Sequence, residues 1–426
     1  IIQRCLAKEP GQRYQRASEI RAALEALQSG TAIVAAPTPK AVLRRWWFWA
    51  VAVPLLLIGL GVVIAAIRGV PFNIGISRIE RPAAPLGLGG RPCKPSDNPE
   101  ANEYLQKGAL LLTGQFEVPR ARQMFEKALE LDPHFADARI AYGLTFVIML
   151  HAGYSNDPGV LYKAEEELRR ALQDEPNCGL APAILAGVYL LQGRKELVPG
   201  EIDRALKLDP NSRSAMIWSL LYHRLNGDYA EAQAIGEKLL EADPTFFPAR
   251  TFLGELYREQ GKLPDAIRAQ EKVVEQDLTN ILAIRHLARA CIDQGDLRRA
   301  RAALERARPQ DRPNYSLRVT WALLLAREGK GAQALKEMDG ETQKYAEVHG
   351  FTTADAAAFY AVLGDKEKAL EWLDRAVRNG DERLEWFQRD PLLASVRNEP
   401  RFKQILESIA YRRQQRGRRA TSAAGR

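Results

Sequence analysis

Three residue types recur every thirty-four residues over much of this 426-residue sequence. The members of the three series are Gly193, Gly227, Gly261, Gly295 and Gly329; Pro176, Pro210 and Pro244; and Ala232, Ala266, Ala300 and Ala334. Gly364 and Ala369 continue the glycine and alanine series at a spacing of thirty-five. A fixed period of this length is typical of arrays of one supersecondary unit. The spacing therefore predicts a stack of repeated units.

Each period contains two amphipathic helical patterns separated by a glycine, as residues 250–278 illustrate. Glycine suits the end of the first helix because it adopts the left-handed conformation without a Cβ clash. Proline suits the break after the second helix, where it cannot continue the hydrogen-bond ladder. The recurrent alanines are expected where two helices pack too closely for a larger side chain.

This pattern resembles the tetratricopeptide repeat family. The small, aromatic and proline positions of that family appear as Ala109, Ala121, Phe125, Ala128 and Pro133, and again as Ala186, Tyr189, Ala205 and Pro210. The resemblance implies an all-α solenoid of about eight helix pairs over residues 101–383. The expected repeats are 102–135, 136–178, 179–212, 213–246, 247–280, 281–314, 315–349 and 350–383.

Two departures from the regular array are expected. The second repeat carries extra residues around the sequence HAGYSNDPG, which predict a protruding loop between its helices. Residues 384–410 predict capping helices, because the last apolar face of an array would otherwise meet water.

The family resemblance also implies a binding groove lined by the first helix of each pair. Four arginines fall at groove positions of repeats four to six: Arg224, Arg258, Arg285 and Arg289. Guanidinium groups bind carboxylates bidentately, so these side chains could clamp an acidic or C-terminal carboxylate of a protein or peptide ligand. The alternative is a hydrated groove in which the arginines pair with glutamates of the chain itself.

Residues 46–67 form an uncharged run of twenty-two residues. As a helix the run would be about 33 Å long, enough to cross a hydrocarbon core of about 30 Å. It predicts a single transmembrane helix between a juxtamembrane segment, 29–45, and a Pro/Gly-rich linker, 68–100. Lys and Arg flanking the run favour a cytoplasmic N-terminal side and repeats outside the cytoplasm. Small residues at Gly61, Ala65 and Gly69 would allow a homodimer through this helix.

Residues 1–28 resemble the last helices of bacterial serine/threonine protein kinases. The resemblance rests on the string from Arg4 to Pro10 and on Arg13, whose counterpart in the family pairs with a glutamate near the activation segment. The chain contains no Gly-rich loop over ATP, no catalytic loop and no metal-binding Asp-Phe-Gly. We therefore expect a kinase-like remnant with a structural Arg13. ATP and magnesium are expected only for a kinase domain preceding Ile1.

The net charge, the cysteines and the histidines do not indicate any further partner or cofactor. The net charge of +8 owes six units to arginines in the last sixteen residues, which predict a basic disordered tail over 411–426 and no nucleic-acid partner. The four cysteines are far apart and the five histidines are scattered. Neither a disulfide framework, a metal site nor a cofactor is expected.

These observations lead to three hypotheses for function. The first is the scaffold or sensor region of a transmembrane serine/threonine kinase that binds partner proteins in the groove. The second is that the repeats recruit substrates for the full-length kinase. The third is the membrane-anchored repeat region of a transcriptional regulator or a general assembly scaffold.

Overall fold

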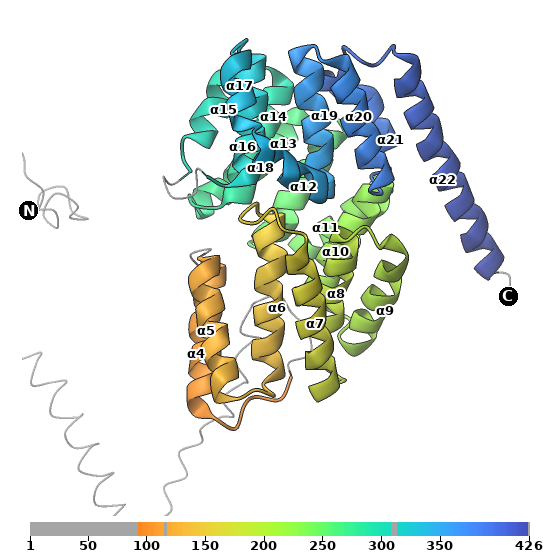
Figure 1. Ribbon diagram of the computed structural model, residues 1–426. Helices are drawn as coiled ribbons and strands as arrows, with labels where there is room; N and C mark the ends of the chain where they lie inside the picture. The colour runs from red at the N-terminus through yellow and green to blue at the C-terminus, as the bar shows by residue number, and fades with distance from the viewer. Residues whose placement is uncertain (1–92, 115–116, 308–312, 425–426) are drawn as a thin grey trace, which may run out of the picture. The chain divides into compact units, whose positions relative to one another are not determined.

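The computed structural model describes residues 93–114, 117–307 and 313–424 (Figure 1). These ranges contain the predicted repeat region apart from two short gaps, 115–116 and 308–312. The kinase-like segment with Arg13, the juxtamembrane segment, the expected span at 46–67 with its dimerisation face, and most of the linker lie outside the described residues.

No helix in the described part of the chain could cross a membrane. The longest helix, α22 (Pro400–Ala424), is rich in arginine, and each of the other described helices has at most sixteen residues. Sixteen residues span about 24 Å, less than a hydrocarbon core of about 30 Å. This finding corrects the predicted fold class, which placed a transmembrane helix before the solenoid, and the predicted localisation as a single-pass membrane protein. The described residues form an all-α solenoid.

The expected helix pairs are present in all eight repeats. They are α4 (Pro99–Gly114) with α5 (Val118–Leu131), α6 (Ala136–His151) with α7 (Gly159–Asp174), α8 (Leu180–Leu191) with α9 (Val198–Leu208), α10 (Arg213–Asn226) with α11 (Tyr229–Ala242), α12 (Phe247–Glu259) with α13 (Leu263–Gln276), α14 (Ile281–Gln294) with α15 (Leu297–Leu304), α16 (Tyr315–Arg327) with α17 (Gly331–Glu337) and α18 (Gly340–Val348), and α19 (Gly350–Leu363) with α20 (Lys366–Arg378). In the seventh repeat the second helix is divided, because Asp339 starts a new helix by accepting a hydrogen bond from the Thr342 amide.

The periodic glycines and alanines have the roles that their spacing predicts. All six glycines of the series have positive φ, between 75° and 87°, at the end of a first helix. The five periodic alanines are at most 1 % exposed. First helices of successive repeats contact one another from α4 to α19 and form one continuous face, which is the face that a groove would use.

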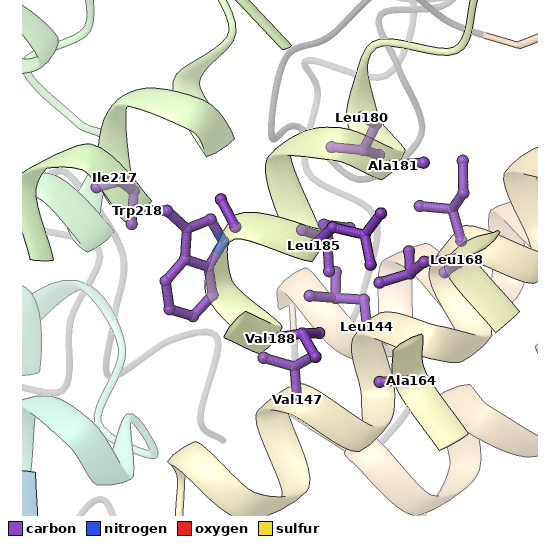
Figure 2. Packing of buried hydrophobic residues seen from close by; sticks show 14 of the residues in the cluster. Leu144, Val147, Ala164, Leu168, Leu180, Ala181, Leu185, Val188, Ile217 and Trp218 are labelled. Atoms are coloured by element: carbon purple, nitrogen blue, oxygen red, sulfur yellow. The ribbon is translucent and has the colours of Figure 1, made fainter. Parts of the chain in front are cut away.

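The core contains a close contact between the third and fourth repeats. A Cβ atom on Gly187 of α8 would lie only 2.2 Å from the Trp218 ring of α10, so glycine is required there. Figure 2 shows Trp218 beside this helix, with Leu185 and Val188 packed toward α6. The small residue lets an indole ring fill the space between two first helices.

The loop of the second repeat does not protrude. It packs against the start of α16 in the seventh repeat, where the Tyr315 amide donates to the Gly153 carbonyl at 2.9 Å and the Asn314 side-chain amide donates to the Ala152 carbonyl at 2.8 Å. Asn156 also bonds Glu341 at 2.7 Å. The second and seventh repeats are therefore in direct contact, and the array closes on itself.

The C-terminal elements are α21 (Leu384–Arg389), a 3₁₀ turn (Pro391–Leu393) and α22, which packs on α20 and α21 (Figure 1). The capping helices are thus present, but the expected disordered tail is helical as far as Ala424. Arg416 donates to the Asn226 side chain at 3.0 Å, and Arg413 pairs with Glu385 at 2.7 Å. These basic side chains anchor the helix to the fourth repeat and to α21.

A disulfide links Cys93 to Cys178, eighty-five residues later. The expectation of no disulfide was wrong, because stacking of the first two repeats brings the segment before α4 to the turn before α8. Asp137 lies within 4.8 Å of both sulfurs. Burial raises the pKa of Asp137 to about 6, although a hydrogen bond from the Cys93 backbone opposes the shift. With both thiols bonded to each other, this cluster offers no thiolate to a metal.

Candidate functional site

The four predicted groove arginines lie on three adjacent first helices: Arg224 on α10, Arg258 on α12, and Arg285 and Arg289 on α14. Each is only 3–5 % exposed. We call these arginines and the carboxylates that contact them the arginine cluster. Such a burial of charge is costly unless each charge is paired and hydrogen-bonded.

Arg224 and Arg258 are paired by two glutamates of α12. Arg224 Nε lies 3.1 Å from Glu259, and its Nη2 lies 3.2 Å from Glu255. Arg258 contacts Glu255 through two nitrogens at 3.1 Å and reaches Asp293 of the next repeat at 2.9 Å. These carboxylates come from the same helix and from the adjacent repeat, so neighbouring repeats share their counterions.

Arg289 is paired by three aspartates. Its guanidinium lies 3.2 Å from Asp293 on its own helix, 3.2 Å from Asp355 on α19, and 3.2 Å from Asp390 just after α21. One arginine thus connects the sixth repeat, the eighth repeat and the C-terminal cap.

The segment 381–393 covers the arginine cluster. The Trp386 ring lies 4.5 Å from the Arg258 guanidinium, and Arg383 forms an ion pair with Glu259. The Glu382 amide donates to the Leu225 carbonyl at 2.9 Å, and Arg389 donates to the Gln260 carbonyl at 3.1 Å. The chain's own C-terminal segment therefore occupies the face where a peptide ligand was expected.

The ion pairs control the protonation of the buried acids. Burial alone would raise the pKa of Glu255, but Arg258 and His286 hold it well below its usual range. For Asp293, burial outweighs its arginine neighbours and raises the pKa to about 6. Glu255 is thus charged near neutral pH, and the same holds for Glu259, whose pKa is lowered by Arg224 and Arg383 against the effect of burial.

Arg285 differs from the other three arginines. Among the described residues it has no carboxylate partner; its hydrogen bond is to His286, from Nη2 to Nε2 at 3.1 Å, and its Nε has none. His286 in turn contacts Glu255 through Nδ1 at 2.9 Å. Burial lowers the pKa of His286 to about 4, so this imidazole is neutral near pH 7 and can accept the hydrogen bond from Arg285 at Nε2.

A pair of buried histidines lies beside this arginine. His349 Nε2 is 3.1 Å from His151 Nδ1, and His349 Nδ1 is 2.6 Å from the Thr352 hydroxyl. Burial lowers the pKa of His151 to about 3, and the charge of Arg285 adds to this effect. His151 Nε2 has no hydrogen-bond partner in the described structure.

His151 also forms part of the wall of a small apolar pocket of about 140 Å³. The pocket lies among α6, α10 and α12, and its wall includes Val147, Trp218 and Phe252. A larger cavity of about 330 Å³ lies between the second and third repeats and the eighth, with Tyr162 and Arg378 in its wall. Sequence patterns revealed neither cavity, because residues far apart in the chain form each wall.

Models of two families match parts of the chain. One is described as anaphase-promoting complex, cyclosome, subunit 3, and matches residues 225–307; the other is a tetratricopeptide repeat that matches residues 200–245. Residues 200–245 thus match a tetratricopeptide repeat, and the helix pairs of the described residues form a solenoid of the tetratricopeptide-repeat type. These tetratricopeptide repeats are of a kind that generally binds protein partners. No curated protein sequence matches the chain.

The chain is similar in part to several solved structures. The human IFIT1 dimer with PPP-AAAA is 20% identical and covers 65% of this chain and 72% of its own, with a TM-score of 0.48. The APC/C hetero-tetramer Cut9–Hcn1 is 14% identical, and the match covers 74% of this chain and 57% of the Cut9–Hcn1 chain, with a TM-score of 0.49. Pseudomonas aeruginosa pilF is 20% identical, and the match covers 56% of this chain and 96% of pilF, with a TM-score of 0.34.

Proposed function

We propose that the tetratricopeptide repeats hold partner proteins for a serine/threonine protein kinase, whose final helices correspond to residues 1–28. The observation that carries this proposal is the presence, in one chain, of a repeat scaffold suited to protein–protein interaction and a kinase-like ending from Arg4 to Arg13. The repeats would bring substrates or regulators to the kinase.

Of the four arginines expected to clamp a partner's carboxylate, three already have carboxylate partners within the chain. Arg224, Arg258 and Arg289 already contact carboxylates of the chain, so a partner's acid could reach them only by replacing these partners. Arg285 needs no such replacement, and it is the arginine with which an added carboxylate would pair at lowest cost.

The kinase proposal is tested with the protein encoded by the natural gene, including whatever precedes Ile1. Deleting residues 102–383 should preserve phosphorylation of a generic peptide substrate and abolish phosphorylation of the partners that bind the repeats. The 426-residue chain alone should transfer no phosphate from ATP and magnesium. A gene without a kinase catalytic loop before Ile1, or unchanged partner phosphorylation after the deletion, would contradict the proposal.

A further inference from the structure

Three buried polar groups on α6, α12 and α14 lack a hydrogen-bond partner within the described structure: His151 Nε2, which lies in the wall of the small pocket, Thr251 Oγ1 and Arg285 Nε. Thr251 and Arg285 occupy equivalent positions of adjacent repeats, thirty-four residues apart, on the contacting helices α12 and α14. Phe252, next to Thr251, lies 6.1 Å from the His151 ring. Buried polar groups are nearly always satisfied, so these three atoms are available to hydrogen-bond a bound molecule.

The environment of Arg285 indicates the charge of a molecule that could bind these groups. This guanidinium is 5 % exposed and has no counterion among the described residues, whereas its three neighbours in the arginine cluster are paired with carboxylates. An unpaired cation at such a depth is unfavourable. A carboxylate would supply both the charge and two acceptor oxygens that suit the guanidinium.

The size and polarity of the pocket indicate the part of the ligand that is not the carboxylate. The pocket wall is almost entirely apolar, with Val147, Trp218 and Phe252 among its residues, and it includes the His151 imidazole. A dry apolar cavity of about 150 Å³ holds one benzene ring, and this pocket of about 140 Å³ has the same size. An extended peptide would need a row of such pockets.

We propose that this pocket and Arg285 form a binding site for a small apolar monocarboxylate, about the size of phenylacetate. The carboxylate pairs with Arg285 and accepts a hydrogen bond from His151 Nε2. This requires each hydrogen bond of the chain Thr352–His349–His151 to be donated toward His151. The Thr352 hydroxyl then donates to His349 Nδ1 over 2.6 Å, and His349 Nε2 donates to His151 Nδ1 over 3.1 Å. The apolar body fills the pocket. This site requires no protein ligand, but it uses the same Arg285 with which a partner's carboxylate would pair, so a bound monocarboxylate would compete with a partner's acid for this arginine.

The test measures binding of three probes to the purified 426-residue chain by calorimetry. Phenylacetate carries both features, phenylacetamide is its neutral isostere, and acetate lacks the ring. We expect phenylacetate to bind about tenfold or more tightly than either of the other two, because it combines a charged hydrogen bond with apolar burial. Equal binding of phenylacetamide would overturn the role of the charge, and equal binding of acetate would overturn the role of the pocket.

Two variants and a control assign the site to these residues. Arg285→Met should remove the preference for phenylacetate over phenylacetamide, and Ile148→Trp, which fills the pocket wall, should abolish binding of both. Arg298→Met, the same substitution at an exposed position, should leave all affinities unchanged. Circular dichroism melts establish that each variant is folded. Undiminished phenylacetate binding by folded Arg285→Met, or binding only of a hexapeptide that ends in Phe, would refute the proposal.

Discussion

Arg289 and Asp390 are 101 residues apart in the chain, and their side chains meet at 3.2 Å with both groups at most 4 % exposed. The contact joins a groove helix to the cap. Arg285, one turn earlier on the same helix, is equally buried but has no carboxylate partner in the part of the chain that the structure describes. The two arginines therefore allow a matched comparison.

We predict effects of different size on stability for substitutions of these two arginines. Arg289→Met leaves three aspartates without their shared partner, and breaking a buried pair in this way typically costs about 3–5 kcal/mol. Arg285→Met removes an uncompensated charge and should cost less than about 1 kcal/mol or stabilise the protein. Urea unfolding of the full chain at pH 7 measures both. Equal destabilisation would show that Arg285 has a carboxylate partner in solution.

The buried histidines predict a loss of stability in acid. The pKa of His151 is lowered to about 3 and that of His349 well below 6.5, so the unfolded chain binds more protons than the folded chain below pH 6.5. Each unit of pH below about 6.5 should therefore cost up to about 1.4 kcal/mol per histidine. Between pH 7 and pH 5 the free energy of unfolding should fall in both proteins. The fall should be about 2–4 kcal/mol smaller in the double variant His151→Phe with His349→Phe than in the parent.

The control for this acid effect is His134→Gln, because the His134 side chain is 84% exposed. Its unfolding free energy should depend on pH as that of the parent does. If the double variant also keeps the pH dependence of the parent, the histidine pair is not the origin of the acid lability.

The periodic alanines predict intolerance of larger side chains. Ala266 is 1 % exposed and Ala300 is fully buried. Overpacking a core site typically costs about 1–3 kcal/mol, so Ala266→Leu or Ala300→Leu should lower the thermal midpoint of the full chain. Lys262→Ala, at an exposed position, should change stability by less than about 0.5 kcal/mol. Leucine variants that melt with the parent would show that these sites are not tightly packed.

The disulfide predicts sensitivity to reduction. Closing a loop between Cys93 and Cys178 restricts the unfolded chain, and such bonds typically contribute about 2–4 kcal/mol. Cys93→Ser should therefore lower the stability of the oxidised chain to that of the reduced parent. Reducing agent should not destabilise Cys93→Ser any further. A parent chain that melts identically with and without reducing agent would contradict the presence of the bond.

The helix pairs, their turn glycines and their buried alanines could be predicted because they depend on neighbours in the sequence. Gly227 and Ala232, for example, act within one repeat and its immediate contacts. The position of Arg224 on the face of first helices was predicted for the same reason. A fixed period reports local geometry, and tetratricopeptide repeats have mostly local geometry.

Features that depend on contacts between distant repeats could not be predicted. The period does not show that Asp390 returns to Arg289, that His151 meets His349 across 198 residues, or that Cys93 reaches Cys178. The arginine-rich sequence of α22 also gave no sign that its basic side chains find partners on earlier elements. Each of these contacts is set by the superhelical path of the array, which sequence spacing does not determine.

Contact between the loop 152–158 and the start of α16 bears on how the chain folds. The Ser316 hydroxyl donates to the Ala152 carbonyl across 164 residues, so this contact forms only after the repeats between them are stacked. Loop-closure entropy opposes bringing such distant segments together, and contacts of this kind slow folding. We therefore expect an open array to form first and to close in a separate, slower phase. Until then the loop stays accessible to a protease, and it would be among the last surfaces to gain protection during refolding.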